Sequence, residues 1–271
     1  MMRLLLIAAL FACSKPAAQP LRVSLIPTTD PGKMLRENQP LVDYLSQRTG
    51  AKVQLTIPTN YAAVVEALVN DQLDIAHLGG FTYLQARKRA GVVPLVQRDR
   101  DQQFHSVFVT QPDSAIKSLD DLSGKSFAFG DVNSTSGHLM PEYYMRQRVD
   151  PDVISKALYT GGHDATLLAV VNGKVDAGAL DEQVLARLIG EGKVDAAKVR
   201  VFYITPPFFD YVWVARKGLD PKIAEAVGQA FLELQGDNPI LALFSATKYV
   251  RASDGDYDKL REAATVAGLL K

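Results

Sequence analysis

The chain has 271 residues, of which 47% are hydrophobic and 22% charged, with 30 Lys+Arg against 30 Asp+Glu. This is the composition of an ordinary globular protein, and it excludes disordered, collagen-like and disulfide-scaffold chains. A formal charge of zero, with no basic run longer than 87–89, also argues against a nucleic-acid partner, because such a partner requires clustered cations. The length allows one large or two medium domains.

The first thirteen residues have the pattern of a secretory signal: Arg3 precedes an apolar run at 4–11, and the chain turns polar after Cys13. The run is far shorter than the roughly 20 residues that cross a bilayer as a helix. Cys13 is the only cysteine, and residues 10–13 resemble a bacterial lipobox, in which the cysteine is acylated. An incidental thiol in an ordinary signal peptide is the alternative. We expect residues 14–20 to be a tether, and the mature protein to be a membrane-anchored lipoprotein in the periplasm or at the cell surface.

From Arg22 onward, short apolar runs alternate with amphipathic segments at helical spacing, which is typical of α/β proteins with parallel strands. Strands are expected at 22–26, 53–57, 74–78, 92–97, 104–110, 126–130, 157–160, 176–180, 199–204 and 210–216. Helices are expected at 33–48, 61–70, 81–90, 136–148, 164–172, 181–191, 221–235, 239–246 and 254–268. The chain from Pro221 onward is predicted to be nearly all helical.

An internal repeat relates residues 61–78 to residues 163–180 at a constant offset of 102 residues, with six of eighteen aligned positions identical. Both copies have the pattern of a helix, a turn at Asn-Asp or Asn-Gly, and a short apolar strand. We interpret the repeat as two similar βαβ lobes; coincidence between two helix-turn-strand units is the alternative.

The extended segments 104–110 and 210–216 flank the middle third and are expected to cross between the lobes. Lobe one would then comprise residues 21–105 and 213–271, and lobe two residues 106–212. Helix N-termini and loops converge at the carboxyl ends of parallel strands, so a ligand is expected in the cleft between the lobes.

The sharpest local motif runs from Gly130 to His138, between an expected strand and an expected helix. Ser134, Thr135 and Ser136 place three hydroxyls beside the backbone N–H groups that a helix leaves unpaired at its start, which predicts a cradle for an oxyanion. The motif lacks both the lysine of a Walker loop and the G-x-S-x-G of a nucleophile elbow. A plain helix cap, which needs only one hydroxyl, is the alternative.

Other strand-to-helix junctions carry further candidates. His163 follows a Gly-Gly pair and can donate to an anion, while Asp164 can cap the helix; a structural histidine is the alternative. The matching junctions of lobe one offer Tyr61, Thr82 and Tyr83 as donors or as packing residues.

Asp181 and Asp210 also follow strands or turns at the expected cleft. A carboxylate near an anion implies that the ligand brings a proton or an ammonium group, with capping and turn roles as the alternatives. No metal, cofactor or catalytic residue is expected, because no cysteine remains to bind zinc, Ser134 has no recognisable base, and metal-ligand spacing is lacking among His77, His105, His138 and His163.

With these motifs, the mature chain resembles the phosphonate-binding proteins of bacterial ABC importers, a family that includes phosphite- and phosphate-binding members. The resemblance rests on residues 23–27, 60–68, 73–80, 133–137, 162–165 and 172–176. It implies an α/β, two-lobed periplasmic binding protein of type II, with two crossing hinge strands, that closes on its ligand. An ABC permease is the implied partner, and we expect a monomer.

The resemblance also implies roles for individual residues. The oxyanion would be bound by Tyr61, Ser134, Thr135, Ser136 and His163, while Asp181 and Asp210 would read the protonated or non-phosphoryl side of the ligand. Binding energy would come from neutral donors and helix N-termini, because no cluster of Lys or Arg falls in the expected cleft.

The sequence departs from the family pattern at Phe104, where members often have a tyrosine at the start of the first crossing strand. Either His105 replaces the lost hydroxyl or the ligand has fewer oxygens or substituents there, so the identity of the ligand stays open. The lack of a mature cysteine argues against the chemistry of arsenite-sensing relatives. A ligand-presenting partner of a membrane sensor kinase and an enzyme on the same fold are the other functions considered.

Overall fold

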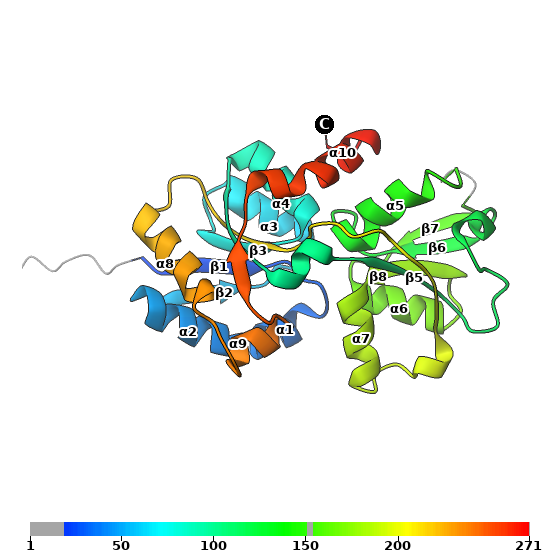
Figure 1. The fold of residues 1–271 in the computed structure, drawn as a ribbon, viewed down its shortest axis with the longest axis horizontal. Helices are drawn as coiled ribbons and strands as arrows, with labels where there is room; N and C mark the ends of the chain where they lie inside the picture. The colour runs from blue at the N-terminus through cyan, green and yellow to red at the C-terminus, as the bar shows by residue number, and fades with distance from the viewer. Residues whose placement is uncertain (1–18, 151–153, 271) are drawn as a thin grey trace, which may run out of the picture.

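The computed structural model describes residues 19–150 and 154–270. Cys13, the signal segment and residues 14–18 of the expected tether lie outside the described residues. The described chain forms two α/β lobes that lie side by side, each built on its own sheet (Figure 1). Within residues 19–150 and 154–270, no helix combines the length and apolarity required to span a bilayer.

The strands occur close to their predicted positions. The first sheet contains Leu21–Leu25 (β1), Val53–Thr56 (β2), Ile75–Leu78 (β3), Val93–Arg98 (β4), Val212–Ala215 (β10) and Tyr249–Arg251 (β11), in the order β11-β4-β10-β3-β1-β2. The second contains Ser106–Thr110 (β5), Ser126–Phe129 (β6), Lys156–Tyr159 (β7), Ala177–Asp181 (β8) and Arg200–Ile204 (β9), in the order β7-β6-β8-β5-β9.

Helices cover both faces of the two sheets (Figure 1). They are Pro31–Glu37 (α1), Gln39–Thr49 (α2), Tyr61–Val69 (α3), Gly80–Ala90 (α4), Met140–Met145 (α5), His163–Val171 (α6), Glu182–Gly190 (α7), Pro221–Leu232 (α8), Pro239–Leu243 (α9) and Asp258–Val266 (α10). One apolar core cluster runs from the α3–α4 side of lobe one, through Phe104 and Phe208, to the α5 side of lobe two.

The sheets are mixed rather than purely parallel. β1 pairs parallel with β2 and β3, and β6 pairs parallel with β7 and β8. In contrast, β5 and β10 run antiparallel to their neighbours. Each of these two strands follows a crossing from the other lobe, so it enters its sheet from the opposite direction.

The two crossing segments lie against each other. Phe104 and Phe208 exchange two backbone hydrogen bonds, each of 3.0 Å, as an isolated antiparallel bridge, and their ring centroids are 6.0 Å apart. The regular strands β5 and β10 begin only after this bridge, at Ser106 and Val212. The link between the lobes is therefore a narrow pair of chains, which is the form of a hinge.

Three predicted elements differ from the structure. The helix expected at 33–48 is two helices that meet at Asn38, because Pro40 has no N–H to continue the hydrogen-bond ladder. The helix expected at 136–148 starts as a π turn at Thr135–Leu139 and ends at Met145. The C-terminal part contains β11, which pairs with β4 and is only three residues long, too short to show a period in the sequence.

The internal repeat has the same structure in both lobes. α3 leads through a turn into β3, and α6 leads through a turn into β8. The Asp74 carboxylate accepts a bond of 2.9 Å from the backbone N–H of Arg22 in β1, and the Asp176 carboxylate accepts one of 2.7 Å from Ser126 in β6. The repeated aspartate therefore fixes the start of the neighbouring parallel strand in each lobe.

Candidate functional site

The polar residues that the sequence singled out are all buried, and most of them lie where the two lobes meet. Each is at most 3% exposed, although all carry hydroxyl, imidazole or carboxyl groups. The set comprises Tyr61, Thr82, Tyr83, Ser134, Thr135, Ser136, His163, Asp181 and Asp210. Buried polar groups require partners, so where each one points decides what the site can do.

The hydroxyl motif begins a π turn. Ser134 caps it, because its Oγ accepts the Gly137 N–H at 3.0 Å, and the Leu139 N–H reaches back to the Ser134 carbonyl at 3.0 Å. Four residues after Gly137 stands Pro141, which has no N–H to donate to the Gly137 carbonyl. That carbonyl instead accepts the Gly130 N–H at 2.9 Å, which ties the end of β6 to the start of the turn.

Gly137 brings the hydroxyl turn against His163. A Cβ on Gly137 would lie 2.9 Å from Ser134 Oγ and 3.0 Å from His163 Cε1. Only glycine fits between these two groups without displacing one of them. Two predicted donors from different elements, Ser134 and His163, are thus placed side by side.

His163 is held as a neutral donor. Its Nδ1 accepts the Asp181 backbone N–H at 3.3 Å, so we assign the ring proton to Nε2, which is buried without a partner among the described residues. Burial lowers the pKa of the imidazole, although the nearby Asp181, Asp164 and Asp131 act in the other direction. The His163 backbone N–H also donates to the Thr28 carbonyl of the opposite lobe at 3.2 Å.

Asp210 lies on the returning crossing segment and faces the start of α4. Its Oδ1 accepts the Gly80 N–H at 2.9 Å, and its Oδ2 is buried without a partner among the described residues. Burial raises the pKa of the Asp210 carboxyl to about 7, with Asp101 and Asp181 adding to the effect. Near neutral pH this group can therefore either accept or donate a proton.

Thr135 joins Asp210 at the start of α4. Its hydroxyl oxygen accepts the Phe81 N–H at 3.0 Å, across the interface between the lobes. A Cβ on Gly79 would lie 3.1 Å from Thr135 Oγ1 and 3.3 Å from Asp210 Oδ1. Thr135 and Asp210 are therefore neighbours of the same helix end.

Tyr61 supplies a third buried polar atom without a partner among the described residues, its phenol oxygen. Burial raises the pKa of the phenol well above 10, and Asp131, Asp210 and Asp181 raise it further, whereas Ser134 lowers it. The Tyr61 hydroxyl is therefore a neutral donor. The Asp131 carboxylate also accepts the Tyr61 backbone N–H at 3.4 Å.

Asp131 was not singled out from the sequence. Its second oxygen accepts the Asn133 N–H at 2.7 Å, so the signal available was an aspartate in a turn directly after β6. The contact with Tyr61 joins residues 70 positions apart, and no local pattern predicts it.

Asp181 is fully engaged by the protein. One carboxylate oxygen caps α7 by accepting the Gln183 and Val184 N–H groups at 2.6 and 3.2 Å, and the other accepts the Tyr211 hydroxyl at 3.1 Å. Its capping role, weighed from the sequence as an alternative, is thus present in the structure. Tyr211 was not predicted as a site residue.

Three other predicted residues are used elsewhere. The Thr82 hydroxyl donates to the Gly79 carbonyl within α4 at 2.8 Å. Tyr83 bonds to Asp254, and its ring packs against Tyr257 at 4.7 Å, away from the hydroxyl turn. Asp164 does not cap α6, because the helix already begins at His163; its carboxylate accepts the next backbone N–H at 2.8 Å.

The position that departs from the family pattern is apolar. Phe104 is fully buried, 5.5 Å from the Tyr211 ring in an edge-on contact. His105 does not replace the missing hydroxyl, since its Nδ1 lies 2.7 Å from the Thr205 carbonyl, outside the group described above.

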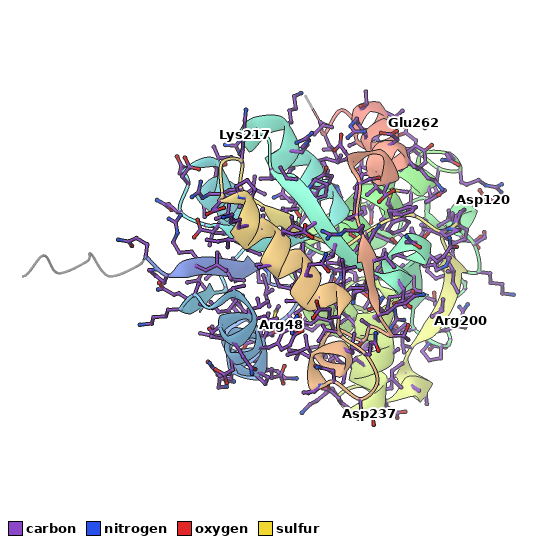
Figure 2. All side chains as sticks on the ribbon, turned by 60° about the vertical axis from the view of Figure 1, so that its left-hand side comes forward. Arg48, Asp120, Arg200, Lys217, Asp237 and Glu262 are labelled. Atoms are coloured by element: carbon purple, nitrogen blue, oxygen red, sulfur yellow. The ribbon has the colours of Figure 1, made fainter. Side chains whose placement is uncertain are left out.

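The charges around the site are mainly negative. Asp131, Asp181 and Asp210 lie near enough to the Tyr61 phenol to raise its pKa, whereas the buried guanidinium of Arg98 is already bonded to Asp101 at 2.8 Å. Charged side chains such as Arg48, Asp120 and Glu262 lie on the outside of the molecule (Figure 2). The site therefore offers neutral donors and one carboxyl that can carry a proton, which suits a protonated oxyanion.

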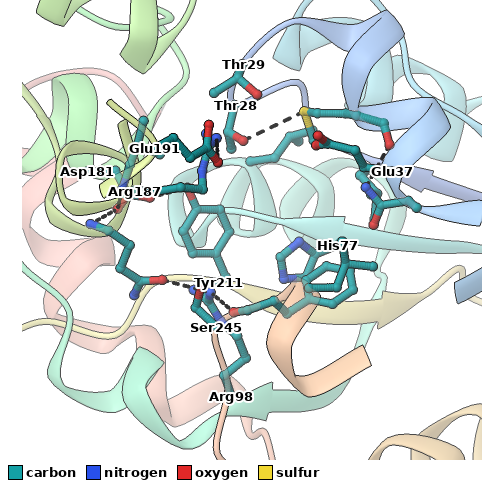
Figure 3. A pocket seen from close by; sticks show the side chains of 18 residues that line it. Thr28, Thr29, Glu37, His77, Arg98, Asp181, Arg187, Glu191, Tyr211 and Ser245 are labelled. Carbon is teal, nitrogen blue, oxygen red and sulfur yellow. Dashed lines mark hydrogen bonds and ion pairs between the residues drawn. The ribbon is translucent and has the colours of Figure 1, made fainter. Parts of the chain in front are cut away.

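A cavity of about 460 Å³ opens beside this group, between the lobes (Figure 3). It is lined by Leu25, Ile26, Thr28, Thr29, Met34, Glu37, Asn38, His77, Arg98, Asp181, Gln183, Val184, Arg187, Glu191, Tyr211, Leu243, Phe244 and Ser245. The hydroxyl turn does not line it, but Asp181 and Tyr211 do, so the cavity adjoins the group of buried polar residues without containing it.

Two lobes, two crossing segments and an interlobe set of polar groups define a type II periplasmic binding protein. The comparisons narrow this class. Residues 23–257 match the family described as ABC transporter, phosphonate, periplasmic substrate-binding protein, and the chain belongs to that family.

The relatives agree with this assignment. The chain is 32% identical to the probable ABC transporter phosphite binding protein PhnD1 of Prochlorococcus marinus, over 80% of each chain, and 27% identical to the phosphate-import protein PhnD of Mycolicibacterium smegmatis, over 91% of this chain and 85% of that one. The structure of the Prochlorococcus protein in complex with methylphosphonate superposes with a TM-score of 0.87 at 30% identity, covering 92% of this chain and 98% of that one. A binding protein of an ABC phosphonate transporter from Pseudomonas aeruginosa superposes with a TM-score of 0.84 at 25% identity, covering 93% of this chain and 87% of that one.

Proposed function

We propose that this periplasmic binding protein captures a small phosphorus oxyanion, a phosphonate, phosphite or phosphate, in the group of residues between its lobes. The observation that carries the proposal is that three of the predicted site residues each have a buried polar atom without a partner among the described residues: Tyr61 Oη, His163 Nε2 and Asp210 Oδ2. They come from lobe one, lobe two and the returning crossing, so one small guest can satisfy all three. An unsatisfied buried polar group costs about 1–3 kcal/mol, which such a guest would offset.

The donors have separate roles in this proposal. Ser134, Ser136 and the start of the π turn bind oxyanion oxygens from lobe two, and Tyr61 binds from lobe one. Thr135 and Asp210 are held at the start of α4, where the protonated carboxyl donates to one ligand oxygen. Asp181 acts through His163, because the backbone N–H of Asp181 fixes the orientation of the His163 ring. Thr82 and Tyr83 have no part in this proposal, because their hydroxyls are bonded elsewhere.

The relatives support the ligand class. The named binding partners are phosphite for the Prochlorococcus protein, phosphate for the Mycolicibacterium protein, and methylphosphonate in the superposed structure. All three share a tetrahedral phosphorus with at least two oxygens. The apolar Phe104 beside Tyr211 favours a ligand with a hydrogen or methyl group over one with a fourth oxygen.

Isothermal titration of wild type with phosphite, methylphosphonate and phosphate tests this function. Replacing Ser134, Thr135 and Ser136 together by alanine is expected to weaken binding of the preferred anion at least about 100-fold, since two or more hydrogen bonds to a charged ligand are lost at about 1.5–3 kcal/mol each. Ser118→Ala and Ser253→Ala, which remove the hydroxyls of two other turns, are the matched controls and should leave affinity unchanged. Unchanged affinity in the triple variant contradicts the proposal.

We further propose that the protein is a monomer that delivers its ligand to an ABC permease, and that it binds rather than transforms the anion. The moving bodies would be residues 21–105 with 213–271, and residues 106–212. Cys13 would carry the lipid anchor and residues 14–20 the tether. Mass spectrometry of the mature chain tests the anchor, because acylation adds a lipid mass to an N-terminal Cys13.

A further inference from the structure

Tyr211 lies between two different environments. On one side its hydroxyl donates to Asp181 at 3.1 Å, and the groups that raise the pKa of its buried phenol include Tyr61 and Asp210 of the anion-binding group. On the other side its ring lines the 460 Å³ cavity, where Figure 3 shows it between Asp181 and His77. The same side chain thus faces the anion-binding group and the cavity.

The ring of Tyr211 is held in this position from several directions. His77 stacks on it at 5.2 Å with an interplanar angle of 10°. The Arg98 guanidinium lies 4.9 Å from its centroid, and Phe104 meets it edge-on at 5.5 Å. Arg98 is itself fixed by Asp101, so the ring cannot swing aside without disturbing a buried ion pair.

We propose that the Tyr211 side chain, anchored by its hydrogen bond to Asp181, is the wall between the anion-binding group and the cavity, and that it limits the bound ligand to a phosphorus oxyanion with no substituent larger than a methyl group. This inference rests on the proposed function, because it names the size class of the ligand at the same site. A longer substituent would have to occupy the volume of the Tyr211 ring.

The cavity behind the wall is suited to polar chemistry. Asn38 and Gln183 line it from opposite lobes, and each has one buried polar atom without a partner among the described residues, the Asn38 Oδ1 acceptor and the Gln183 Nε2 donor. Arg187 and Glu191 also line it. Removal of the wall would therefore join the anion-binding group to a space that can accommodate an amino-bearing chain.

The first test uses wild type and needs no variant. Titration with methyl-, ethyl- and propylphosphonate should show affinity falling at least about tenfold for each carbon after the first, as expected when methylenes are forced against a closed wall. If the dissociation constants of wild type for propylphosphonate and methylphosphonate differ by less than tenfold, the proposed role of Tyr211 as a wall is wrong. A wild type that binds none of these anions, nor phosphite or phosphate, refutes the proposed function instead.

The second test removes the wall. In Tyr211→Ala the ratio of the dissociation constant for 2-aminoethylphosphonate to that for methylphosphonate should fall at least about tenfold below the wild-type ratio. Tyr211→Phe keeps the ring and should retain most of the discrimination. Asn38→Ala, the control at another residue that lines the cavity, should keep the wild-type ratio within about twofold. An unchanged ratio in a folded Tyr211→Ala overturns the proposal, and if that variant does not fold, the chain-length series on wild type decides.

Discussion

Asp210 is the residue at which we expect protonation to control anion binding. Its carboxyl is buried beside an α4 N–H donor, yet burial still raises its pKa to about 7. The protonated form can donate to an anion, whereas the ionised form would place a second negative charge against it. Among the described residues, the buried guanidinium of Arg98 does not offset such a repulsion, since it is bonded to Asp101.

We therefore expect anion affinity to fall as pH rises above about 7, because Asp210 then ionises. The Asp210→Asn variant cannot ionise, so the ratio of the wild-type to the variant dissociation constant should rise toward about tenfold per pH unit above that point. Titrating both proteins with one anion at each pH cancels the ionisation of the ligand itself. A ratio that stays flat from pH 6 to 9 would show that Asp210 does not meet the anion.

The same group links stability to pH in the free protein. Its pKa is raised from 3.8 to about 7, so between these values the folded state holds a proton that the unfolded state has lost. The stability that this proton confers is fully present below about pH 4 and is lost as pH rises through about 7. Asp210→Asn lacks this loss, which thermal unfolding of the two proteins across that range would separate from the binding effect.

Local sequence patterns predicted the hydroxyl turn and His163 but not their neighbours. The strand-to-helix junction carries its three hydroxyls on consecutive residues, Ser134, Thr135 and Ser136, so a local pattern is enough to find them. Tyr211 bonds to Asp181 across 30 residues, where the returning crossing segment meets lobe two, and Tyr61 bonds to Asp131 across 70 residues, between the lobes. Pairs this far apart in the sequence are set by the tertiary fold and not by a local pattern. Tyr83 is the opposite case: the local pattern selected it as a site residue, but its phenol donates a hydrogen bond to Asp254, which is distant in the sequence.

Among the elements, those with a clear period were predictable and those defined by pairing were not. β11 exists because residues 249–251 align with β4, and nothing in three residues reveals this. The π turn before α5 follows from Pro141, which has no N–H to bond to the Gly137 carbonyl. Pro141 is visible in the sequence, but its effect on the helix start can be recognised only from the hydrogen bond between Gly130 and Gly137.

The repeated helix-turn-strand unit supports a prediction about its shared aspartate. Asp74 is buried and bonded to Arg22 and Arg216 at 2.8–2.9 Å, while Asp176 is exposed and bonded to the backbone and hydroxyl of Ser126. Burial acts to raise the pKa of Asp74, but its arginine partners outweigh this and lower it to about 2. The contribution of the ionised Asp74 carboxylate to the free energy of unfolding is thus present above pH 3.8 and is lost as pH falls through about 2.

Asp74→Asn should lower the free energy of unfolding at pH 7 by about 2–3 kcal/mol, because it removes charge-assisted bonds and leaves two arginines without their carboxylate. Asp176→Asn, the matched change in the other lobe, should cost about 1 kcal/mol, since its partners are neutral and it is open to water. Denaturant unfolding monitored by circular dichroism measures both. Equal costs would mean that the arginine pairs add nothing to the repeated turn.

The two lobes touch through direct hydrogen bonds from several elements. Beyond the His163–Thr28 and Phe81–Thr135 bonds, Gln85 donates to Asn133 at 2.9 Å and Arg98 to Gln183 at 3.0 Å. Lys33 and Glu191 form an ion pair of 3.5 Å at the edge of the cavity. Only the two crossing segments join the lobes covalently, so these contacts, rather than the chain itself, set the closed arrangement.

Closure carries a cost that a ligand can remove. In the closed form the Tyr61 hydroxyl and the His163 Nε2 are buried without partners among the described residues, and Tyr61 of lobe one lies near the carboxyl groups of Asp131, Asp181 and Asp210. Each unsatisfied group weighs against the closed form by about 1–3 kcal/mol, which exceeds what an exposed ion pair such as Lys33–Glu191 returns. The equilibrium between open and closed forms should therefore depend on whether an anion supplies the missing partners.

We accordingly expect the radius of gyration of wild type, measured by small-angle X-ray scattering, to decrease when a saturating phosphorus oxyanion is added. The Ser134/Thr135/Ser136 triple-alanine variant should keep the radius of the free protein at the same anion concentration, because it lacks the donors that couple binding to closure. Chloride at equal ionic strength controls for screening of the surface charges. If wild type binds the anion in a calorimetric titration but its radius of gyration does not decrease, the free protein is already closed. The buried groups without partners would then not control opening and closing at the hinge.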